Sequence, residues 1–230
     1  MYGRFLTRRS AGDHIINELD NMTGTENRYK PLEGCRVLLA SHSPRRRELL
    51  GKLDVEVEIL PLIEVNEAFP AKMAPEEVAA YISRKKAHPY MAQLNDREIL
   101  LTADTVVINR GEVLGKPADA EDAALMLRLL SGHTHKVVTG VTLATKKRTV
   151  TFSDITEVDF APLTHEEIDY YVETYRPFDK AGAYGIQEWI GYVGISGIRG
   201  DYYNVMGLPL HSLYTRLVMM ANGFRKSGNR

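Results

Sequence analysis

Three consecutive arginines, Arg45 to Arg47, stand in the first turn of a predicted helix, where cations are least expected. Ser43 suits the N-cap of this helix and Pro44 suits its first position. Each cation opposes the helix dipole at a cost of roughly 0.3–1 kcal/mol, and a bound anion reverses that sign. Ser41 and Ser43 add hydroxyl donors beside the free N–H groups of the helix start. The pattern favours a polyphosphate site over a solvated basic surface, the usual explanation for such a run.

A single carboxylate interrupts an apolar stretch. Asp104 lies within LLTADTVV, and a charged side chain is unfavourable inside a buried core strand. Two interpretations stay open: the strand ends there and Asp104 faces solvent or caps a turn, or Asp104 is a strand-end carboxylate that holds Mg²⁺ or activates water. Glu64 and Glu67, in the acidic loop after the predicted strand over 55–62, are candidates for a second carboxylate.

Two lysines and a glutamine could complete such a site, and each also has an ordinary structural interpretation. Lys116 lies in a Gly-Lys-Pro turn that lacks the glycine spacing of a P-loop. Lys86 stands in the last turn of a predicted helix, where a lysine complements the dipole. Gln187 could recognise a base edge, with Tyr184 and Trp189 as pocket walls. Alternatively, the glycine-rich stretch around Gln187 is a folded-in loop with packed aromatic side chains.

The elements that must position these residues alternate early in the chain and form hairpins later. In the first half we expect a strand and a helix over 36–52, a strand over 55–62 and a helix over 75–87. A strand interrupted at Asp104 follows, with a hairpin turn at 109–111, and then a helix between Asp119 and Gly132. The second half should contain two strands around the turn 146–148, a helix capped by Thr164 and Glu167, and a last helix from Pro209 to Gly223. This order predicts an α/β fold with a mixed sheet.

Composition excludes several classes of protein. The 230 residues carry a net charge of −1, so no global field draws the chain to nucleic acid or to anionic lipid. One cysteine, Cys35, excludes an intramolecular disulfide and a cysteine-based zinc site. His133 and His135 lack a third metal ligand at useful spacing, and we interpret them as structural. We therefore expect a cytoplasmic protein without a membrane or nucleic-acid partner.

Five segments in chain order resemble the Maf family, the septum-formation-type nucleoside triphosphate pyrophosphatases. They are LASHSPRRRELL, TADTVVINRGEVLGKP, LSGHTHKVVTGV, PFDKAGAYGIQ and NVMGLPL. The resemblance implies a mixed, twisted α/β sheet with flanking helices in two lobes around a cleft, often in a homodimer. We accordingly expect a nucleotide pyrophosphatase domain over residues 34–230, preceded by a flexible N-terminal extension over residues 1–33.

The same resemblance implies an activity. The family hydrolyses nucleoside triphosphates between the α- and β-phosphates to the monophosphate and pyrophosphate, a house-cleaning of nucleotide pools. The segment AGAYGIQ resembles that of the subgroup that acts on dTTP and UTP. Glu188 and Trp189 follow this segment, where many members of the subgroup have glycine. The alternatives are a non-catalytic nucleotide-binding regulator of septum formation and a pyrophosphatase for a modified purine triphosphate such as ITP.

The family's motifs also imply roles for individual residues. A divalent cation, Mg²⁺ with Mn²⁺ or Co²⁺ as alternatives, would be held by Asp104 and Glu67. The same two carboxylates, with Lys86 and Lys116, form the implied catalytic set. The implied substrate-binding set consists of Ser41, Ser43, Arg45, Arg46, Thr105 and Gln187.

Overall fold

The computed structural model describes residues 31–227, with side chains as far as Phe224. Most of the predicted N-terminal extension, residues 1–30, lies outside the described residues. From Leu32 onward the chain forms one compact unit. None of the helices described in it is both long enough and apolar enough to cross a membrane.

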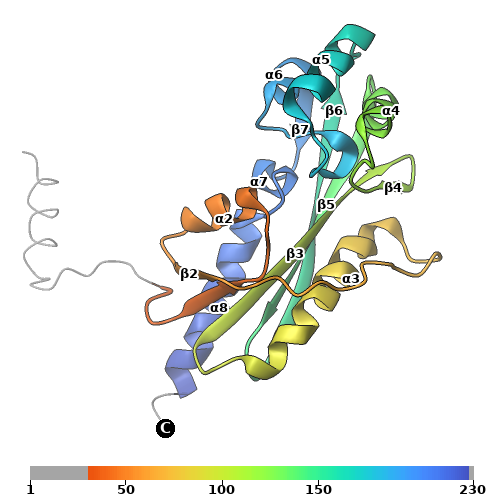
Figure 1. Cartoon of the computed structure of the whole chain (residues 1–230). Coiled ribbons are helices and arrows are strands. Elements are labelled where there is room, and N and C mark those ends of the chain that lie inside the picture. The colour runs from red at the N-terminus through yellow and green to blue at the C-terminus, as the bar shows by residue number, and fades with distance from the viewer. Residues whose placement is uncertain (1–30, 228–230) are drawn as a thin grey trace, which may run out of the picture. The chain divides into compact units, whose positions relative to one another are not determined.

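Strands and short helices account for most of the described chain (Figure 1). The strands are β1 (Arg36–Leu39), β2 (Glu56–Ile59), β3 (Glu98–Asn109), β4 (Glu112–Leu114), β5 (Thr134–Ala144), β6 (Thr149–Phe160) and β7 (Ile195–Arg199). The α-helices are α2 (Pro44–Gly51), α3 (Pro75–Ala87), α4 (Ala120–Leu130), α5 (His165–Tyr175), α6 (Trp189–Gly194), α7 (Tyr202–Val205) and α8 (Leu210–Ser227). Two 3₁₀ turns, η1 (His88–Gln93) and η2 (Ala181–Ala183), complete the set.

All of these strands belong to one mixed sheet, as the sequence predicts. The strand order is β2-β1-β3-β5-β6-β7, with β4 added to the end of β3. β1 is parallel to both β2 and β3, whereas the pairs β3–β5, β5–β6 and β6–β7 are antiparallel. The parallel part follows from the early alternation of strands and helices, and the antiparallel part follows from the hairpin turns.

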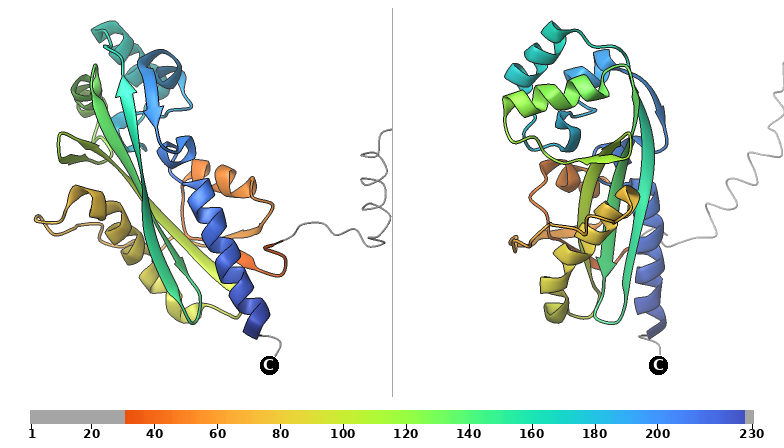
Figure 2. Two further views of the ribbon diagram at one scale, coloured as in Figure 1. Left: turned by 180° about the vertical axis from the view of Figure 1, so that it is seen from behind. Right: turned by 90° about the vertical axis from the view of Figure 1, so that its right-hand side faces the viewer.

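The central strand β3 is covered on both faces, because successive side chains of a strand point to opposite sides of the sheet. On one face Ile99 and Leu101 pack against Leu213 of α8. On the other face Val106 packs against Ile82 of α3. Figure 2 shows α8 and α3 on opposite sides of the long strands. A strand buried in this way carries apolar residues on both faces, and β3 does so over 99–101 and 106–108, on either side of Asp104.

A second cluster lies at the other end of β3. Val107 of β3 and Val158 of β6 pack there against Leu127 of α4 and Ile168 and Tyr171 of α5. Val107 is an even number of residues from Leu101, so this cluster and the α8 cluster lie on the same face of β3. The described part of the chain therefore has apolar clusters toward both ends of β3, and the division into two lobes around a cleft stays a prediction.

Two details of the predicted elements were wrong. β3 is not interrupted at Asp104, because the backbone there pairs with Gly140 of β5 and the side chain has a partner in Lys86. The last helix does not end at Gly223 but continues to Ser227, and Phe224 packs against the α8 cluster beyond it. The predicted helix caps are confirmed at Ser43 for α2, at Asp119 for α4, and at Thr164 with Glu167 for α5.

Candidate active site

The middle of β3 has one edge without a strand partner. β1 pairs with β3 only as far as Leu101, and β4 pairs with it only from Val107 onward. On the opposite edge, β5 pairs with β3 throughout this stretch. The residues between Leu101 and Val107 can therefore contact other groups along one edge, and Asp104 lies at the centre of this segment.

Arg46 of α2 occupies this free edge. Its Nη1 donates to the carbonyl oxygen of Ala103 at 2.9 Å, and its Nη2 donates to Thr105 Oγ1 at 3.0 Å. Its Nε donates to the carbonyl oxygen of Gly207 at 2.9 Å. Burial lowers the pKa of Arg46, and the Asp104 carboxylate is the largest opposing influence. Arg46 thus ties the start of α2 to β3 and to the loop before α8, beside Asp104 and away from bulk solvent.

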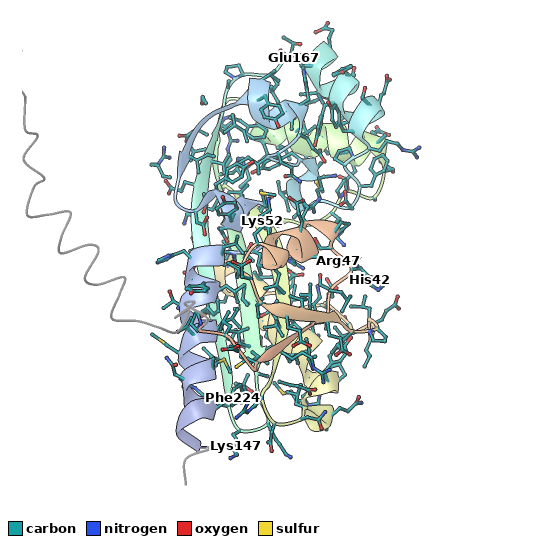
Figure 3. The ribbon with its side chains drawn as sticks, turned by 90° about the vertical axis from the view of Figure 1, so that its left-hand side faces the viewer. His42, Arg47, Lys52, Lys147, Glu167 and Phe224 are labelled. Atoms are coloured by element: carbon teal, nitrogen blue, oxygen red, sulfur yellow. The ribbon has the colours of Figure 1, made fainter. Side chains whose placement is uncertain are left out.

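The third arginine of the run behaves differently. Arg47 is exposed, and Figure 3 shows it on the surface near His42. The cap of α2 does not involve its side chain: Ser43 Oγ accepts a hydrogen bond from the backbone N–H of Arg46, and Ser41 Oγ accepts one from the backbone N–H of Ser43. The first turn of α2 therefore directs two of its three cations into the molecule.

Asp104, Glu67 and Lys86 meet on the α3 face of β3. Lys86 Nζ lies 2.6 Å from Asp104 Oδ1 and 3.0 Å from Glu67 Oε1. Burial raises the pKa of Asp104, while the positive charges of Lys86 and Arg46 act in the opposite direction. The structure therefore brings together three of the four residues that the resemblance implies for catalysis, and these three come from a loop, a helix and a strand.

Two carboxylates at this point are suited to a hard divalent cation. In the described part of the chain, no group of three or more His, Cys, Asp and Glu side chains could hold a metal ion. Mg²⁺, however, usually takes only one or two carboxylates and completes its shell with waters and substrate phosphates. Asp104 Oδ2 has no hydrogen-bond partner among the described residues, so it is available as a ligand. The donor set fits a metal that is shared with a phosphate substrate.

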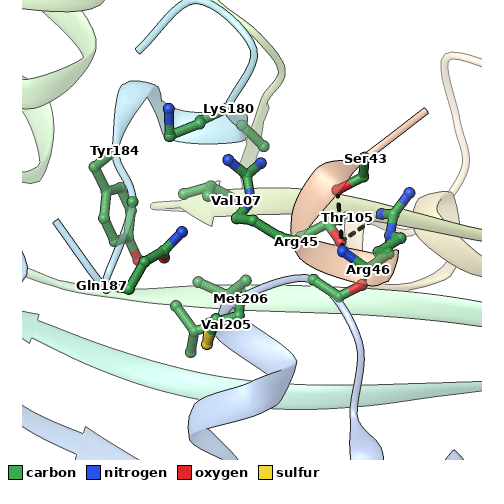
Figure 4. A pocket seen from close by; sticks show the side chains of 14 residues that line it. Ser43, Arg45, Arg46, Thr105, Val107, Lys180, Tyr184, Gln187, Val205 and Met206 are labelled. Atoms are coloured by element: carbon green, nitrogen blue, oxygen red, sulfur yellow. Dashed lines mark hydrogen bonds between the residues drawn. The ribbon is translucent and has the colours of Figure 1, made fainter. Parts of the chain in front are cut away.

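A narrow pocket of about 50 Å³ lies on the other face of β3 (Figure 4). Asp104 and Thr105 are consecutive residues of one strand, so they point to opposite faces, and Thr105 lines this pocket. Of the implied substrate-binding residues, those that line it are Ser43, Arg45, Arg46, Thr105 and Gln187. Ser41 is buried behind Ser43 and supports the start of α2.

Gln187 and Tyr184 contribute polar, uncharged groups to the wall of this pocket, whereas Arg45, Arg46 and Lys180 contribute charges. Gln187 Oε1 is buried and has no hydrogen-bond partner among the described residues. The hydroxyl of Tyr184 lies 2.7 Å from Nε2 of His135. Burial lowers the pKa of His135 to about 4, so its imidazole is neutral at pH 7. The amide oxygen of Gln187 is therefore free to accept a hydrogen bond from a ligand. A buried polar atom without a partner favours such a role, because buried polar groups are normally hydrogen-bonded.

Two charged residues of this region were missed by the sequence analysis. Asp179 Oδ2 lies 3.0 Å from Nη1 of Arg45, and Asp179 Oδ1 lies 2.7 Å from Nζ of Lys180. Lys180 is only 7% exposed and lines the pocket. The available signal was the adjacent Asp-Lys pair within PFDKAG, since lysine is seldom buried without a partner or a purpose.

The residues that follow Gln187 face away from the pocket. Glu188 Oε1 lies 3.1 Å from Lys180 Nζ, and Glu188 Oε2 accepts a hydrogen bond from the hydroxyl of Tyr171. Trp189 packs edge-on against Tyr170, with ring centroids 4.9 Å apart. Neither Glu188 nor Trp189 is among the residues that line the pocket. Both side chains therefore pack outside the pocket lining, and Glu188 contacts the pocket residue Lys180.

Lys116 is the implied site residue that the structure does not join to the others. Its side chain is exposed and has no interaction with another implied site residue among those described. Its neighbour Gly115 accepts a hydrogen bond from the backbone N–H of Gly182 at 3.0 Å. Lys116 therefore follows a residue that contacts η2, and its catalytic role stays a prediction.

Fold and site together define an α/β protein in which a pair of carboxylates and an arginine-bearing helix start meet at one strand edge. The family model described as Maf-like protein matches residues 36–220. The chain belongs to the Maf family, as the five sequence segments indicate.

Curated relatives are similar to the chain over nearly their whole length. A dTTP/UTP pyrophosphatase of Porphyromonas gingivalis is 52% identical over 188 residues, which are 81% of this chain and 94% of that protein. A dTTP/UTP pyrophosphatase of Phocaeicola vulgatus is 50% identical over 186 residues, which are 81% of this chain and 96% of that protein. Among solved structures, the Staphylococcus aureus Ham1 protein aligns with 79% of this chain and 97% of its own, at 13% identity and a TM-score of 0.48.

Proposed function

We propose that this protein hydrolyses dTTP and UTP between the α- and β-phosphates and releases the nucleoside monophosphate and pyrophosphate. The observation that carries the proposal is the meeting of Asp104, Glu67 and Lys86 beside the arginine-bearing start of α2. The names of relatives about half identical to the chain support the choice of substrates. A protein that removes these triphosphates from the nucleotide pool would act in the cytoplasm. The family resemblance supports a homodimer.

The substrate would lie across the free edge of β3. Gln187, on the pocket face, would hydrogen-bond the base, because a pyrimidine offers an N–H donor next to its carbonyl oxygens. The triphosphate would lie along Arg45, Arg46 and the N–H groups of α2, toward Asp104 on the α3 face. This arrangement places the α–β bond between the recognition pocket and the carboxylates.

Binding requires the pocket to widen. Its present volume of about 50 Å³ is below the 300–1,000 Å³ typical of ligand sites. The ion pair between Arg45 and Asp179 links α2 to the loop before η2, across this pocket. Arriving phosphates would compete with Asp179 for the guanidinium of Arg45, so substrate binding and the opening of this contact would be coupled.

The chain's own residues would then perform the hydrolysis. Asp104 would accept a proton from a water whose oxygen attacks the α-phosphorus, while the bond from that phosphorus to the bridging oxygen breaks and pyrophosphate leaves. Burial, which raises the pKa of Asp104, makes this carboxylate a better base, while the positive charge of Lys86 acts to lower that pKa and favours the ionised form. Arg45, Arg46 and Lys86 would stabilise the charge on the departing pyrophosphate. A divalent cation held by Asp104 and Glu67, Mg²⁺ or in its place Mn²⁺ or Co²⁺, would neutralise phosphate oxygens.

Pyrophosphate release from a panel of triphosphates tests this proposal. The panel contains dTTP, UTP, ITP, 7-methyl-GTP and the common nucleotides, each with Mg²⁺. We expect the highest kcat/KM for dTTP and UTP. A wild-type protein that binds dTTP without releasing pyrophosphate would instead be a nucleotide-binding regulator, and a preference for ITP would indicate a pyrophosphatase for modified purines.

A further inference from the structure

A groove of about 370 Å³ lies at the end of α8 that is remote from the active site. It is bounded by the last turns of α8, by the β5–β6 turn at residues 145–148 and by the turn at 95–97 that precedes β3. Figure 3 shows Phe224 and Lys147 together at this end, away from Arg47 of α2. Along β3, about 20 Å separate the groove from Asp104. We call this site the distal groove.

The floor of the distal groove is apolar. Met219, Met220 and Phe224 of α8 contribute to its lining. Met219 is 63% exposed, the second-highest value among the large apolar side chains described as exposed. Thioether and phenyl groups adapt to flat or flexible apolar ligands, and methionine is common on surfaces that bind such ligands. The floor therefore suits the hydrocarbon part of a ligand.

The rim of the distal groove is cationic. It carries Arg97, Lys146, Lys147 and Arg148, all exposed, and one acidic residue, Asp96. None of the four cationic side chains forms an ion pair with another described residue, whereas Lys136, for example, lies 2.9 Å from Glu76. Thr145 Oγ1 accepts hydrogen bonds from the backbone N–H groups of Lys147 and Arg148, which holds the turn in shape. The rim therefore presents four cationic side chains without an ion-pair partner among the described residues, three of them on a turn whose backbone is held by Thr145.

We propose that the distal groove binds a small amphipathic anion, a molecule with an apolar or aromatic body and a phosphate, sulfonate or carboxylate group. The body would lie on Met219 and Phe224, and the anionic group would lie against Lys146, Lys147 and Arg148. An inorganic anion would leave the floor exposed, and a neutral apolar molecule would leave the cations unpaired. A protein partner usually covers about 800 Å² of each surface, whereas a hollow of about 370 Å³ has the size of a small-ligand site.

Fluorescence of 8-anilinonaphthalene-1-sulfonate provides the binding test, since this probe joins an aromatic body to one sulfonate. N-phenyl-1-naphthylamine, its neutral counterpart, is the matched probe. We expect the charged probe to bind at least about tenfold more tightly than the neutral one, equivalent to about 1.4 kcal/mol. Equal affinity for the two probes, or no binding of the charged one, would overturn the proposal.

Variants locate the bound probe. The double change Lys146→Ser/Lys147→Ser and the single change Met219→Glu should each weaken binding of the charged probe at least about tenfold. Leu125→Glu is the matched control for Met219→Glu, because Leu125 is a large apolar residue of α4 that is 51% exposed. Unchanged thermal melting would show that the variants fold. Wild-type affinity in both groove variants would overturn the proposal.

Methionine methyl NMR separates this groove from the substrate site within one spectrum. Met206 lines the active-site pocket, and Met219 and Met220 line the distal groove. The charged probe should shift the signals of Met219 and Met220 and leave that of Met206 in place. A shift of Met206 alone would place the probe in the active site and overturn the proposal.

Competition identifies the natural source of the ligand. Displacement of the probe from Met219 by dodecanoate but not by dTMP would indicate an acyl-chain anion, and the reverse would indicate a nucleotide. Either result supports an amphipathic ligand. Displacement by inorganic pyrophosphate at the same concentration as by dodecanoate and dTMP would show that charge alone is recognised, and would overturn the proposal.

Discussion

The two faces of β3 divide the chemistry of the active site. On the α3 face, Asp104 lies with Lys86 and Glu67 in a cluster of three charges. On the opposite face, Thr105 lines a pocket in which the uncharged side chains of Gln187 and Tyr184 lie beside Arg45, Arg46 and Lys180. Consecutive residues of one strand thus serve two environments.

This difference shows how one strand can support catalysis and recognition without conflict between them. Opposite charges that are held close together and partly buried stabilise one another, and they can act on the phosphates of a substrate. A base is better distinguished by neutral donors and acceptors that are desolvated together with it. Arg46 lies at the free edge between the two environments: it donates to the carbonyl oxygen of Ala103 and to Thr105 Oγ1, and its charge acts on Asp104. The predictions below disrupt this division in order of expected effect.

Loss of the carboxylate on the α3 face should have the largest effect. We expect Asp104→Asn to reduce kcat for dTTP by about 10²–10⁴-fold, the usual contribution of a positioned base. Binding of dTTP, measured by calorimetry, should remain, because the pocket face is unchanged. Asp169→Asn on α5 is the control, since that carboxylate is exposed and remote from β3. Full turnover by Asp104→Asn would contradict the catalytic assignment.

Loss of the link between the two faces should come next. Arg46→Lys removes the planar group that reaches Ala103, Thr105 and Gly207. At roughly 1 kcal/mol for each hydrogen bond, we expect the free energy of unfolding to fall by about 2–4 kcal/mol.

Urea denaturation measures that loss, with Arg47→Lys as the control. Arg47 belongs to the same run and is exposed, so the control should stay within about 0.5 kcal/mol of the wild type. Equal effects of the two substitutions would show that the contacts of Arg46 do not stabilise the fold.

The buried, neutral imidazole of His135 predicts a pH dependence of stability. The pKa of His135 falls from 6.5 to about 4 on folding, so the unfolded chain binds a proton between these values that the folded chain does not. Stability should therefore rise with pH across this window, by roughly 3 kcal/mol at most. The contribution is present above pH 6.5 and is lost as the pH falls toward 4.

Denaturation at several pH values tests this dependence in His135→Gln. The variant should have a shallower pH slope between 4 and 6.5 than the wild type. His133→Gln, at an exposed histidine two residues away, should keep the wild-type slope. A wild-type slope in His135→Gln would assign the acid sensitivity to other groups.

Change of base recognition should have the smallest effect. Gln187→Leu removes one hydrogen-bonding group from the pocket face, at an expected cost of about 1–2 kcal/mol in kcat/KM for dTTP and UTP. Other triphosphates should lose less, so the preference should narrow. Gln93→Leu, at an exposed position of η1, is the control. An equal loss for every triphosphate would argue against a role in base selection.

Several local features could be predicted because neighbouring residues decide them. The N-cap at Ser43 with Pro44 after it, and the capping box of Thr164 and Glu167, involve hydrogen bonds over three residues. The hairpin of β3 and β4 likewise turns at Arg110 and Gly111, as expected from 109–111. The predicted interruption at Asp104 was wrong, because a charged residue in an apolar run can reach a partner 18 residues away without breaking the strand.

By itself, the sequence determined the caps, the turns, the mixed order of strands and helices, and the family, since each depends on residues close together in the chain or on the order of motifs. Only the tertiary structure decided that Lys86 and Glu67 meet at Asp104, and that Arg45 pairs with Asp179, 134 positions later in the chain. It alone also separated Asp104 from Thr105 into two environments. The physical reason is that packing of α2 and α3 against β3 brings side chains together over distances that no local pattern records.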